Sequence, residues 1–283
     1  MAEDVKPTAT ESKTSGLTVP ETHRFTLEPY LPRRDSNGAI DGSSPHLTLT
    51  YAQSLDAQIS LSHGIQTVLS GSETKAMTHY LRSRHDAILV GIGTAEADDP
   101  SLNCRYSEDG RLPAGYERQP IPVILDPGGR WGCREESKVL RLALQGLGKP
   151  PLWLVSHEAT DQCDSARLST LNAAGGELLS GPSKTDFPCW DLILDCLSQR
   201  GIKSVMVEGG GKIIENLLLR RNQALVDSVI VTIAPVWLGK GGVTASPNRA
   251  DDASKQEVGR LQDTAWLPMG NDVVVAGRFA RRS

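Results

Sequence analysis

The chain has 283 residues, of which 39% are hydrophobic and 23% charged, and its formal net charge is -4. This length and apolar content suffice for one large hydrophobic core or two smaller ones. The slightly negative balance provides no basic surface of the kind that binds nucleic acid and no cationic anchor for a membrane, so neither partner is expected.

The cysteines and the N-terminal residues bear on cellular location. The chain has 5 cysteines, an odd number, and no CxxC pair. A disulfide framework is therefore not expected, and we predict packing thiols in a reducing compartment. The opening stretch MAEDVKPTATESKTSGLTVPET lacks the apolar segment of a secretory signal and carries acidic residues that a mitochondrial presequence avoids. We expect a cytoplasmic protein.

The predicted elements begin after a polar N-terminal part. Residues 1–44 are rich in Thr, Ser, Glu, Pro and Gly, which predicts a partly disordered extension, although its segment RFTLEPYLP could pack on the folded domain. HLTLTYAQS (46–54) alternates apolar and polar residues and predicts a strand. SETKAMTHYLRSRHD (72–86) predicts an amphipathic helix with Ser72 as its N-cap. DAILVGIG (86–93) is typical of a strand buried on both faces.

Strands and helices then continue to alternate. Further strands are predicted at PIPVILD (120–126), PLWLVS (151–156), GGELLS (175–180), KSVMVE (203–208), LVDSVIVTIAPVW (225–237) and DVVVAGRFAR (272–281). Helices are predicted at WDLILDCLSQRG (190–201) and KIIENLLLRRN (212–222). This order predicts a single α/β domain over residues 45–283, with a largely parallel central sheet flanked by helices.

The stretch VMVEGGGKIIENLLL (205–219) carries the strongest local signal. A buried strand runs into Gly209, Gly210 and Gly211, and a helix follows. Glycine lets the backbone approach a ligand, and a helix N-terminus attracts an anion such as a pyrophosphate. The spacing matches neither the Rossmann fingerprint nor a Walker A loop. A tight turn without a ligand is the alternative, but Glu208 at the carboxyl end of the strand favours a ligand site.

A second glycine turn lies in VGIGTAEADDPSLNCR (90–105). Gly91 and Gly93 end a buried strand, and Thr94 offers a hydroxyl at a possible N-cap. This stretch also lacks the third glycine of the Rossmann fingerprint, and its Asp-Asp-Pro could simply be a capped turn. We expect the two glycine turns to lie on the same edge of one sheet, where they could hold the two ends of one cofactor.

Taken together, these motifs resemble a known family. PHLTLTYAQSLDAQIS, THYLRSRHDAILVGIGTAEADDPSLNCR, PIPVILD, VMVEGGG and IAPVWLGKGG follow one another as in the reductases of the riboflavin pathway. Those are the C-terminal domain of the bacterial bifunctional deaminase-reductase and the stand-alone fungal and archaeal enzyme. The zinc signature of the deaminase domain, H-x-E with P-C-x-x-C, is absent, so the chain is similar to the stand-alone reductase.

The resemblance implies a single-domain dihydrofolate-reductase-like fold, NADPH as hydride donor and a homodimer. It implies reduction of the ribosyl side chain of 2,5-diamino-6-ribosylamino-4(3H)-pyrimidinone 5′-phosphate to the ribitylamino product. Two alternatives stay open. One is a dihydrofolate-reductase-like oxidoreductase acting on another pterin or pyrimidine, including the deaminated intermediate. The other is a non-catalytic nucleotide-binding protein.

The resemblance also implies site residues. The cofactor-binding positions are Ala52, Thr94, Asp98, Gly209, Gly210, Gly211 and Lys212. The substrate-binding positions are Arg82, Leu102, Arg105 and Glu208. Both arginines would grip the substrate phosphate, because a guanidinium presents a planar fork of donors; Arg82 could instead belong to a solvated helix face.

Two carboxylates are the catalytic candidates. Glu208 would accept hydrogen bonds from the amino groups of the pyrimidinone, or only cap the next helix. Asp56 would polarise a substrate hydroxyl or assist ring opening, or only cap a turn. The chain departs from the family's SLDG motif at Ala57, and from its S-x-W-I-T motif at Gln66–Ser70. None of the six histidines is placed by a motif, and VDSVIVTIAPVW is a candidate dimer-interface strand.

Overall fold

The structure is a computed structural model that describes residues 16–33, 44–111, 119–186, 188–247 and 257–280. Its main sheet has the strand order β10-β11-β8-β1-β7-β3-β4-β5-β6, and β2 pairs with β9 in a small second sheet. The strands are β1 (His46–Gln53), β2 (Gln58–Ser60), β3 (Ala87–Gly91), β4 (Ile121–Leu125), β5 (Leu152–Val155), β6 (Glu177–Ser180), β7 (Ser204–Gly209), β8 (Ser228–Ile233), β9 (Val243–Thr244), β10 (Leu261–Met269) and β11 (Asp272–Phe279).

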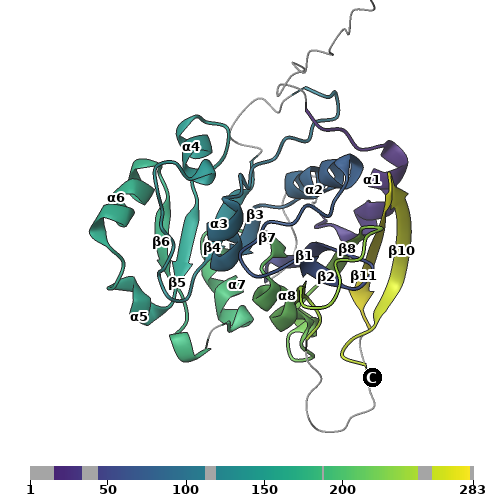
Figure 1. Ribbon diagram of the computed structural model, residues 1–283. Helices are drawn as coiled ribbons and strands as arrows, with labels where there is room; N and C mark the ends of the chain where they lie inside the picture. The colour runs from purple at the N-terminus through teal and green to yellow at the C-terminus, as the bar shows by residue number, and fades with distance from the viewer. Residues whose placement is uncertain (1–15, 34–43, 112–118, 187, 248–256, 281–283) are drawn as a thin grey trace, which may run out of the picture.

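Helices cover both faces of the main sheet (Figure 1). The α-helices are α1 (Glu21–Leu27), α2 (Ser72–Arg84), α3 (Ile92–Asp98), α4 (Lys138–Leu144), α5 (His157–Thr160), α6 (Ser165–Ala173), α7 (Trp190–Ser198) and α8 (Gly211–Leu218). Short 3₁₀ helices are η1 (Glu28–Tyr30), η3 (Lys184–Asp186) and η4 (Gln223–Leu225). In the part of the chain that is described, no helix combines the length and the hydropathy needed to span a bilayer.

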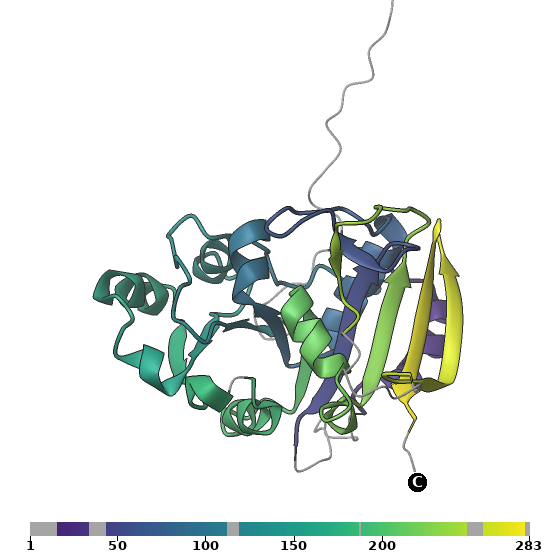
Figure 2. The same ribbon diagram turned by 60° about the horizontal axis from the view of Figure 1, so that its bottom comes forward.

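The sheet is largely parallel, which confirms the predicted α/β class. All pairings from β8 through β1, β7, β3, β4 and β5 to β6 are parallel. Only β11 against β8, and β10 against β11, run antiparallel. The sequence predicted β11 but not β10, which lies beside it at one end of the sheet, as Figure 2 shows.

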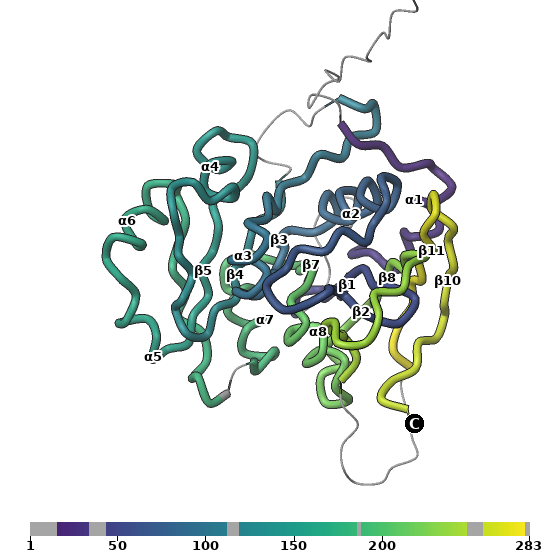
Figure 3. Tube along the Cα trace, in the orientation of Figure 1, coloured from purple at the N-terminus to yellow at the C-terminus, as the bar shows by residue number. Residues whose placement is uncertain are grey.

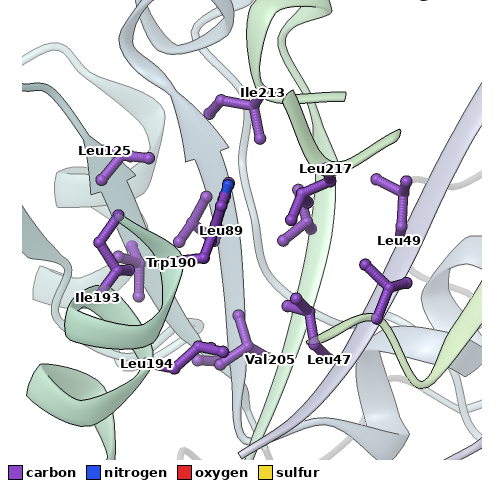
Figure 4. Packing of buried hydrophobic residues seen from close by; sticks show 14 of the residues in the cluster. Leu47, Leu49, Leu89, Leu125, Trp190, Ile193, Leu194, Val205, Ile213 and Leu217 are labelled. Atoms are coloured by element: carbon purple, nitrogen blue, oxygen red, sulfur yellow. The ribbon is translucent and has the colours of Figure 1, made fainter. Parts of the chain in front are cut away.

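The core is divided between the two faces of the sheet. On one face, α7 and α8 pack on the inward side chains of β1, β3 and β7, including Leu47, Leu89 and Val205 (Figure 4). On the other face, α1 and α2 cover the half of the sheet near β8 and β11, and α3, α4 and α6 cover the half near β4 and β5. The central strands are thus buried on both sides, as continuous apolar runs indicate.

The stretch predicted as a dimer interface lies mostly inside the protomer. The stretch VDSVIVTIAPVW contains β8, which is hydrogen-bonded to β1 on one side and to β11 on the other. Its side chains Val229 and Val231 belong to the core cluster under α8, and Ile230 belongs to the cluster under α2. β8 is therefore paired on both edges and packed on both faces, whereas Trp237, at the end of the same stretch, is 72% exposed, and the interface stays a prediction.

The N-terminal extension contributes to the core in its described part. Leu27 and Leu31 are buried in the cluster that α2 forms with the sheet, as predicted for RFTLEPYLP. Figure 3 shows this segment running beside α2 and β10. At α2 itself, Ser72 is the first helical residue rather than the N-cap, which is Gly71. The carboxylate of Asp272 performs the capping, because it accepts hydrogen bonds from the Gly71 N–H and the Thr74 hydroxyl.

Candidate active site

The two glycine turns are neighbours at the carboxyl edge of the sheet. β3 and β7 pair directly, and Val90 lies opposite Gly209 in the register. Helix α3 begins at once after β3, and α8 begins after Gly210. Two strand-to-helix turns therefore open side by side, and the first N–H groups of each helix lack partners within that helix. The prediction that both turns lie on one edge is confirmed.

Gly210 lies between the two turns in a conformation that requires glycine. Its φ of 97° and ψ of 110° lie in a region that L residues rarely adopt. A β-carbon built on it would point toward the first turn, 3.5 Å from Thr94 Oγ1 and 3.7 Å from the backbone of Gly91. Gly210 thus lets the two turns come into contact. A β-carbon on the preceding Gly209 would meet no atom within 4 Å, so the backbone there is open to close approach by a ligand, and we call this opening between the turns the cradle.

Side chains close the other sides of this cradle. A β-carbon on Gly91 would collide with Ile213 of α8, at 2.7 Å, so α8 packs tightly on the end of β3. A β-carbon on Gly211 would come within 3.0 Å of Val243 in β9 and 3.3 Å of Ile59 in β2. The small β2–β9 sheet thus forms a wall of the cradle, which the sequence patterns did not predict.

The remaining cofactor candidates lie on α3, α8 and β1. Thr94 is the third residue of α3 rather than its N-cap, and Lys212 is exposed at the second position of α8. Asp98 ends α3, where burial raises the pKa of its carboxyl and Lys138 partly opposes the rise. Ala52 lies near the end of β1, paired with Thr232 of β8.

Arg82 and Glu208 form a paired fork beside the glycine turns. Arg82 Nε donates to Glu208 Oε1 at 2.6 Å, and Nη2 donates to Oε2 at 2.5 Å. Their side chains are only 12% and 13% exposed. A third donor, Nη1, bonds to the carbonyl of Asn103 at 2.8 Å. Burial disfavours the charged form of Arg82, but the adjacent Glu208 carboxylate more than offsets this effect. The pKa of Arg82 is therefore raised.

This fork has a clear structural origin. Side chains of an α-helix lean toward its N-terminus, so Arg82, near the end of α2, reaches back along the sheet to the end of β7. Arg82 is therefore not a solvated helix residue. Its contacts are to protein acceptors, and they fix the Glu208 carboxylate next to Gly209.

The other two substrate candidates differ in character. Leu102 has a φ of 48° and is 1% exposed within the core cluster under α3, so its side chain packs inside and only its backbone can meet a ligand. Arg105 is exposed. Within the described residues no carboxylate lies at ion-pair distance from its guanidinium, but the imidazole of His79 lies against it. His79 thus adjoins a candidate site residue, and no sequence motif singled it out.

Asp56 organises a turn. Its Oδ1 accepts a hydrogen bond from the Ser54 hydroxyl at 2.5 Å and from the Leu238 N–H at 3.1 Å, and its Oδ2 accepts from the Gly239 N–H at 2.8 Å. These bonds join the β1–β2 turn to the loop after β8. The next residue, Ala57, has a φ of 59°, which explains why a glycine suits this place in the family's SLDG motif.

Asp56→Asn is expected to weaken this junction in a pH-dependent way. The Ser54 hydroxyl, with the two backbone N–H groups, holds the pKa of the Asp56 carboxyl below its ordinary value. A carboxylate of this kind stabilises the fold above its unfolded pKa, about 3.9, and the contribution is lost as the pH falls through the lower folded value. The melting temperature of the variant should be lower at pH 7 and fall less steeply below pH 4. Identical melting curves at every pH would contradict this role.

A separate hollow lies between α1 and α2, away from the glycine turns. It is lined by Glu21, Arg24, Phe25, Glu28, Tyr80, Ser83, Arg84, Tyr106 and Glu108. Its charged groups pair with one another, since Arg84 bonds to Glu28 at 2.5 Å and Arg24 bonds to Glu108 at 3.0 Å. The first pair joins the N-terminal segment to α2, and the second joins it to the loop that contains Glu108.

Comparisons with known proteins agree with the motifs. Residues 45–275 match the family model of the RibD C-terminal domain. The 2,5-diamino-6-ribosylamino-4(3H)-pyrimidinone 5′-phosphate reductase of Debaryomyces hansenii is 44% identical over 226 residues, which cover 78% of this chain and 85% of that protein. The protein of the same name from Candida glabrata is 40% identical over 256 residues, covering 89% and 95%.

A solved structure extends the match to the fold. The riboflavin biosynthesis reductase Rib7 of Saccharomyces cerevisiae aligns with a TM-score of 0.70 at 34% identity, over 92% of this chain and 100% of that chain. The family model covers far more than half of this chain, and the resemblance inferred from the sequence is confirmed. The chain belongs to the RibD C-terminal domain family.

Proposed function

We propose that the chain is the stand-alone NADPH-dependent reductase that converts 2,5-diamino-6-ribosylamino-4(3H)-pyrimidinone 5′-phosphate to its ribitylamino product. The observation that carries the proposal is the open cradle at Gly209, which directly follows Glu208 of the buried Arg82–Glu208 fork. A cofactor phosphate and a polar heterocycle would then lie at adjacent points of one sheet edge. The curated names of relatives at 40% to 44% identity point to the same reaction.

NADPH is the proposed cofactor, and the residues present fit it. The open backbone at Gly209 and the N-terminus of α8 suit a pyrophosphate, which needs close backbone approach and N–H donors. Gly209, at the end of β7, and Gly211 and Lys212, at the start of α8, would hold the same group. From the other turn, Thr94 and Asp98 would hold the rest of the cofactor, with Ala52 supplying a backbone contact. When bound, NADPH supplies the hydride.

We propose that the substrate-binding residues act by binding the pyrimidinone phosphate and orienting it toward the cofactor. Correct placement of two reactants can supply roughly 7 kcal/mol or more of the barrier reduction. Glu208, held by Arg82, would accept hydrogen bonds from the amino groups of the pyrimidinone. Arg105, whose guanidinium has no carboxylate partner among the described residues, would bind the phosphate of the substrate. Leu102 would contact the substrate through its backbone alone. For Asp56, the contacts with the loop after β8 support a positioning role rather than proton transfer.

The direct test is NADPH oxidation, followed by absorbance, in the presence of the ribosylamino pyrimidinone phosphate. The deaminated pyrimidine and dihydrofolate serve as competing substrates. Turnover of the first substrate at a kcat/KM well above the other two is expected. Preference for dihydrofolate would contradict the proposal, and preference for the deaminated form would place the enzyme after the deaminase instead.

Arg105→Ala should separate substrate binding from cofactor binding. Loss of a charge-assisted contact to a phosphate costs about 1.5–3 kcal/mol, so KM for the phosphorylated substrate should rise by roughly 10- to 100-fold. KM for NADPH should change little, because the Gly210 cradle is unaffected. Steady-state kinetics with each reactant varied in turn measures both values. Equal rises in the two would argue against a substrate-phosphate role.

We also propose that residues 45–283 form the reductase domain of a cytoplasmic homodimer. All five cysteines are free, which suits a reducing compartment. Large apolar side chains are exposed at the β10–β11 end of the sheet, where Trp266 is 63% and Val273 36% exposed. Such a patch is typical of an association surface. Sedimentation at micromolar concentration tests the dimer, and Trp266→Glu should shift it toward monomer.

A further inference from the structure

The contact between His79 and Arg105 is unusual because a hydrogen-bond donor of the imidazole faces a hydrogen-bond donor of the guanidinium. The Arg105 backbone N–H donates to His79 Nδ1 at 3.0 Å, and the Arg105 guanidinium nitrogen Nη2 lies 3.2 Å from His79 Nε2. A neutral imidazole has one N–H and one lone pair, and a guanidinium has no lone pair to offer. Only one of the two contacts can therefore be a hydrogen bond.

The backbone contact decides the tautomer. The Arg105 N–H is fixed by the chain, so Nδ1 must accept and the proton of the neutral ring resides on Nε2. The ring is neutral because burial, with Arg82 and Arg105 nearby, lowers the pKa of His79 to about 2. His79 is only 7% exposed. The buried Nε2–H thus points at a guanidinium that cannot accept it. The carbonyl of Asn103 also lies near the ring and favours its protonation, but that carbonyl already accepts from Arg82 Nη1.

The segment that carries Arg105 is held firmly in place. The Arg105 carbonyl accepts from the Leu17 N–H at 2.8 Å, so its backbone is bonded on both sides. Cys104 is bonded through its N–H and its carbonyl to the side chain of Gln119. One turn further along α2, Arg82 anchors the carbonyl of Asn103. The backbone of Arg105 is therefore fixed, while the N–H groups of its guanidinium face an imidazole that does not accept them. This arrangement suits the binding of an anion.

We propose that His79 is a second phosphate donor of the substrate site, with its Nε2–H and the Arg105 guanidinium donating together to one phosphomonoester group. This inference rests on the proposed function and names a further specificity-determining residue for it. A single oxyanion resolves the donor conflict, because each phosphate oxygen accepts several hydrogen bonds. A neutral imidazole that donates one hydrogen bond also keeps this role throughout the neutral pH range.

Binding of inorganic phosphate and of ribose 5-phosphate, measured calorimetrically without turnover, tests the proposal. His79→Asn keeps an acceptor near Nδ1 but lacks the distal donor, and His79→Gln keeps a donor near Nε2 but lacks the proximal acceptor. We expect about a 10-fold or greater loss of ribose 5-phosphate affinity in the Asn variant, the usual effect of losing a hydrogen bond to a charged group. The Gln variant should stay within about threefold of the native protein, and NADPH affinity should be unchanged in both.

Two results would overturn the proposal: native affinity for ribose 5-phosphate in the Asn variant, or equal losses in both variants. Nitrogen-15 NMR of the native protein gives an answer even if a variant fails to fold. The His79 ring should show its proton on Nε2, and that signal should shift when inorganic phosphate is added; an unmoved signal at saturating phosphate refutes the contact. Since these measurements need no pyrimidine, phosphate binding at His79 without pyrimidinone turnover would refute the proposed reaction but not the anion site.

Discussion

Gly210→Val is expected to reduce NADPH affinity by about 100-fold or more while leaving a folded protein. The native φ of 97° is open to glycine and strained for valine, at a cost of order 1–3 kcal/mol. The larger effect is on cofactor binding. The new side chain would project into the gap between the two glycine turns, next to Thr94 Oγ1, where we place the cofactor phosphates. Displacing a phosphate from several N–H donors removes hydrogen bonds worth about 1.5–3 kcal/mol each.

A matched control separates strain from occlusion. Gly201, just after α7, also has a positive φ, 76°, and a β-carbon there would meet open space. Gly201→Val should lower the melting temperature to a comparable extent and bind NADPH normally. Fluorescence titration with NADPH, performed beside thermal melts of both variants, measures the two effects. A folded Gly210→Val protein with native NADPH affinity would disprove the cradle.

The glycine turns could be predicted because their signals are local. A buried strand that runs into glycine and then into a helix has few ways to fold, and parallel strands bring their carboxyl ends to one edge. The juxtaposition of Gly91 and Gly210 followed from those rules. Strand β10 escaped prediction for the opposite reason. As an edge strand with a bulge near Asp263 and a proline at 268, it lacks the alternation that marks a strand.

The side-chain partnerships of the site were beyond the sequence. Arg82 and Glu208 are far apart in the chain, and only the crossing of α2 over β7 makes them partners. His79 carries no motif, and its tautomer depends on the backbone of Arg105. The inward turn of Leu102 depends on a positive φ that leucine rarely adopts. Each of these features is set by tertiary packing, which residue identity and spacing do not encode locally.

Glu208→Ala is expected to be the most damaging single change at the site. Removing one partner of a buried ion pair leaves an uncompensated charge, which costs about 3–5 kcal/mol. Because the Arg82 and Glu208 side chains retain 12% and 13% exposure, the lower end of that range applies. The variant would also lose the acceptor that we assign to the pyrimidinone, so kcat/KM should fall by roughly two to three orders of magnitude. Chemical denaturation and steady-state kinetics measure the two losses separately.

A double variant distinguishes a structural carboxylate from one that binds substrate. Replacing a buried ion pair by apolar residues of similar volume is often neutral or stabilising. Arg82→Met combined with Glu208→Leu should therefore recover most of the lost stability. If Glu208 contacts the substrate, activity stays low in this stable protein, whereas NADPH affinity keeps its native value because Gly210 is untouched. Recovery of activity together with stability would mean that the fork only braces β7 against α2.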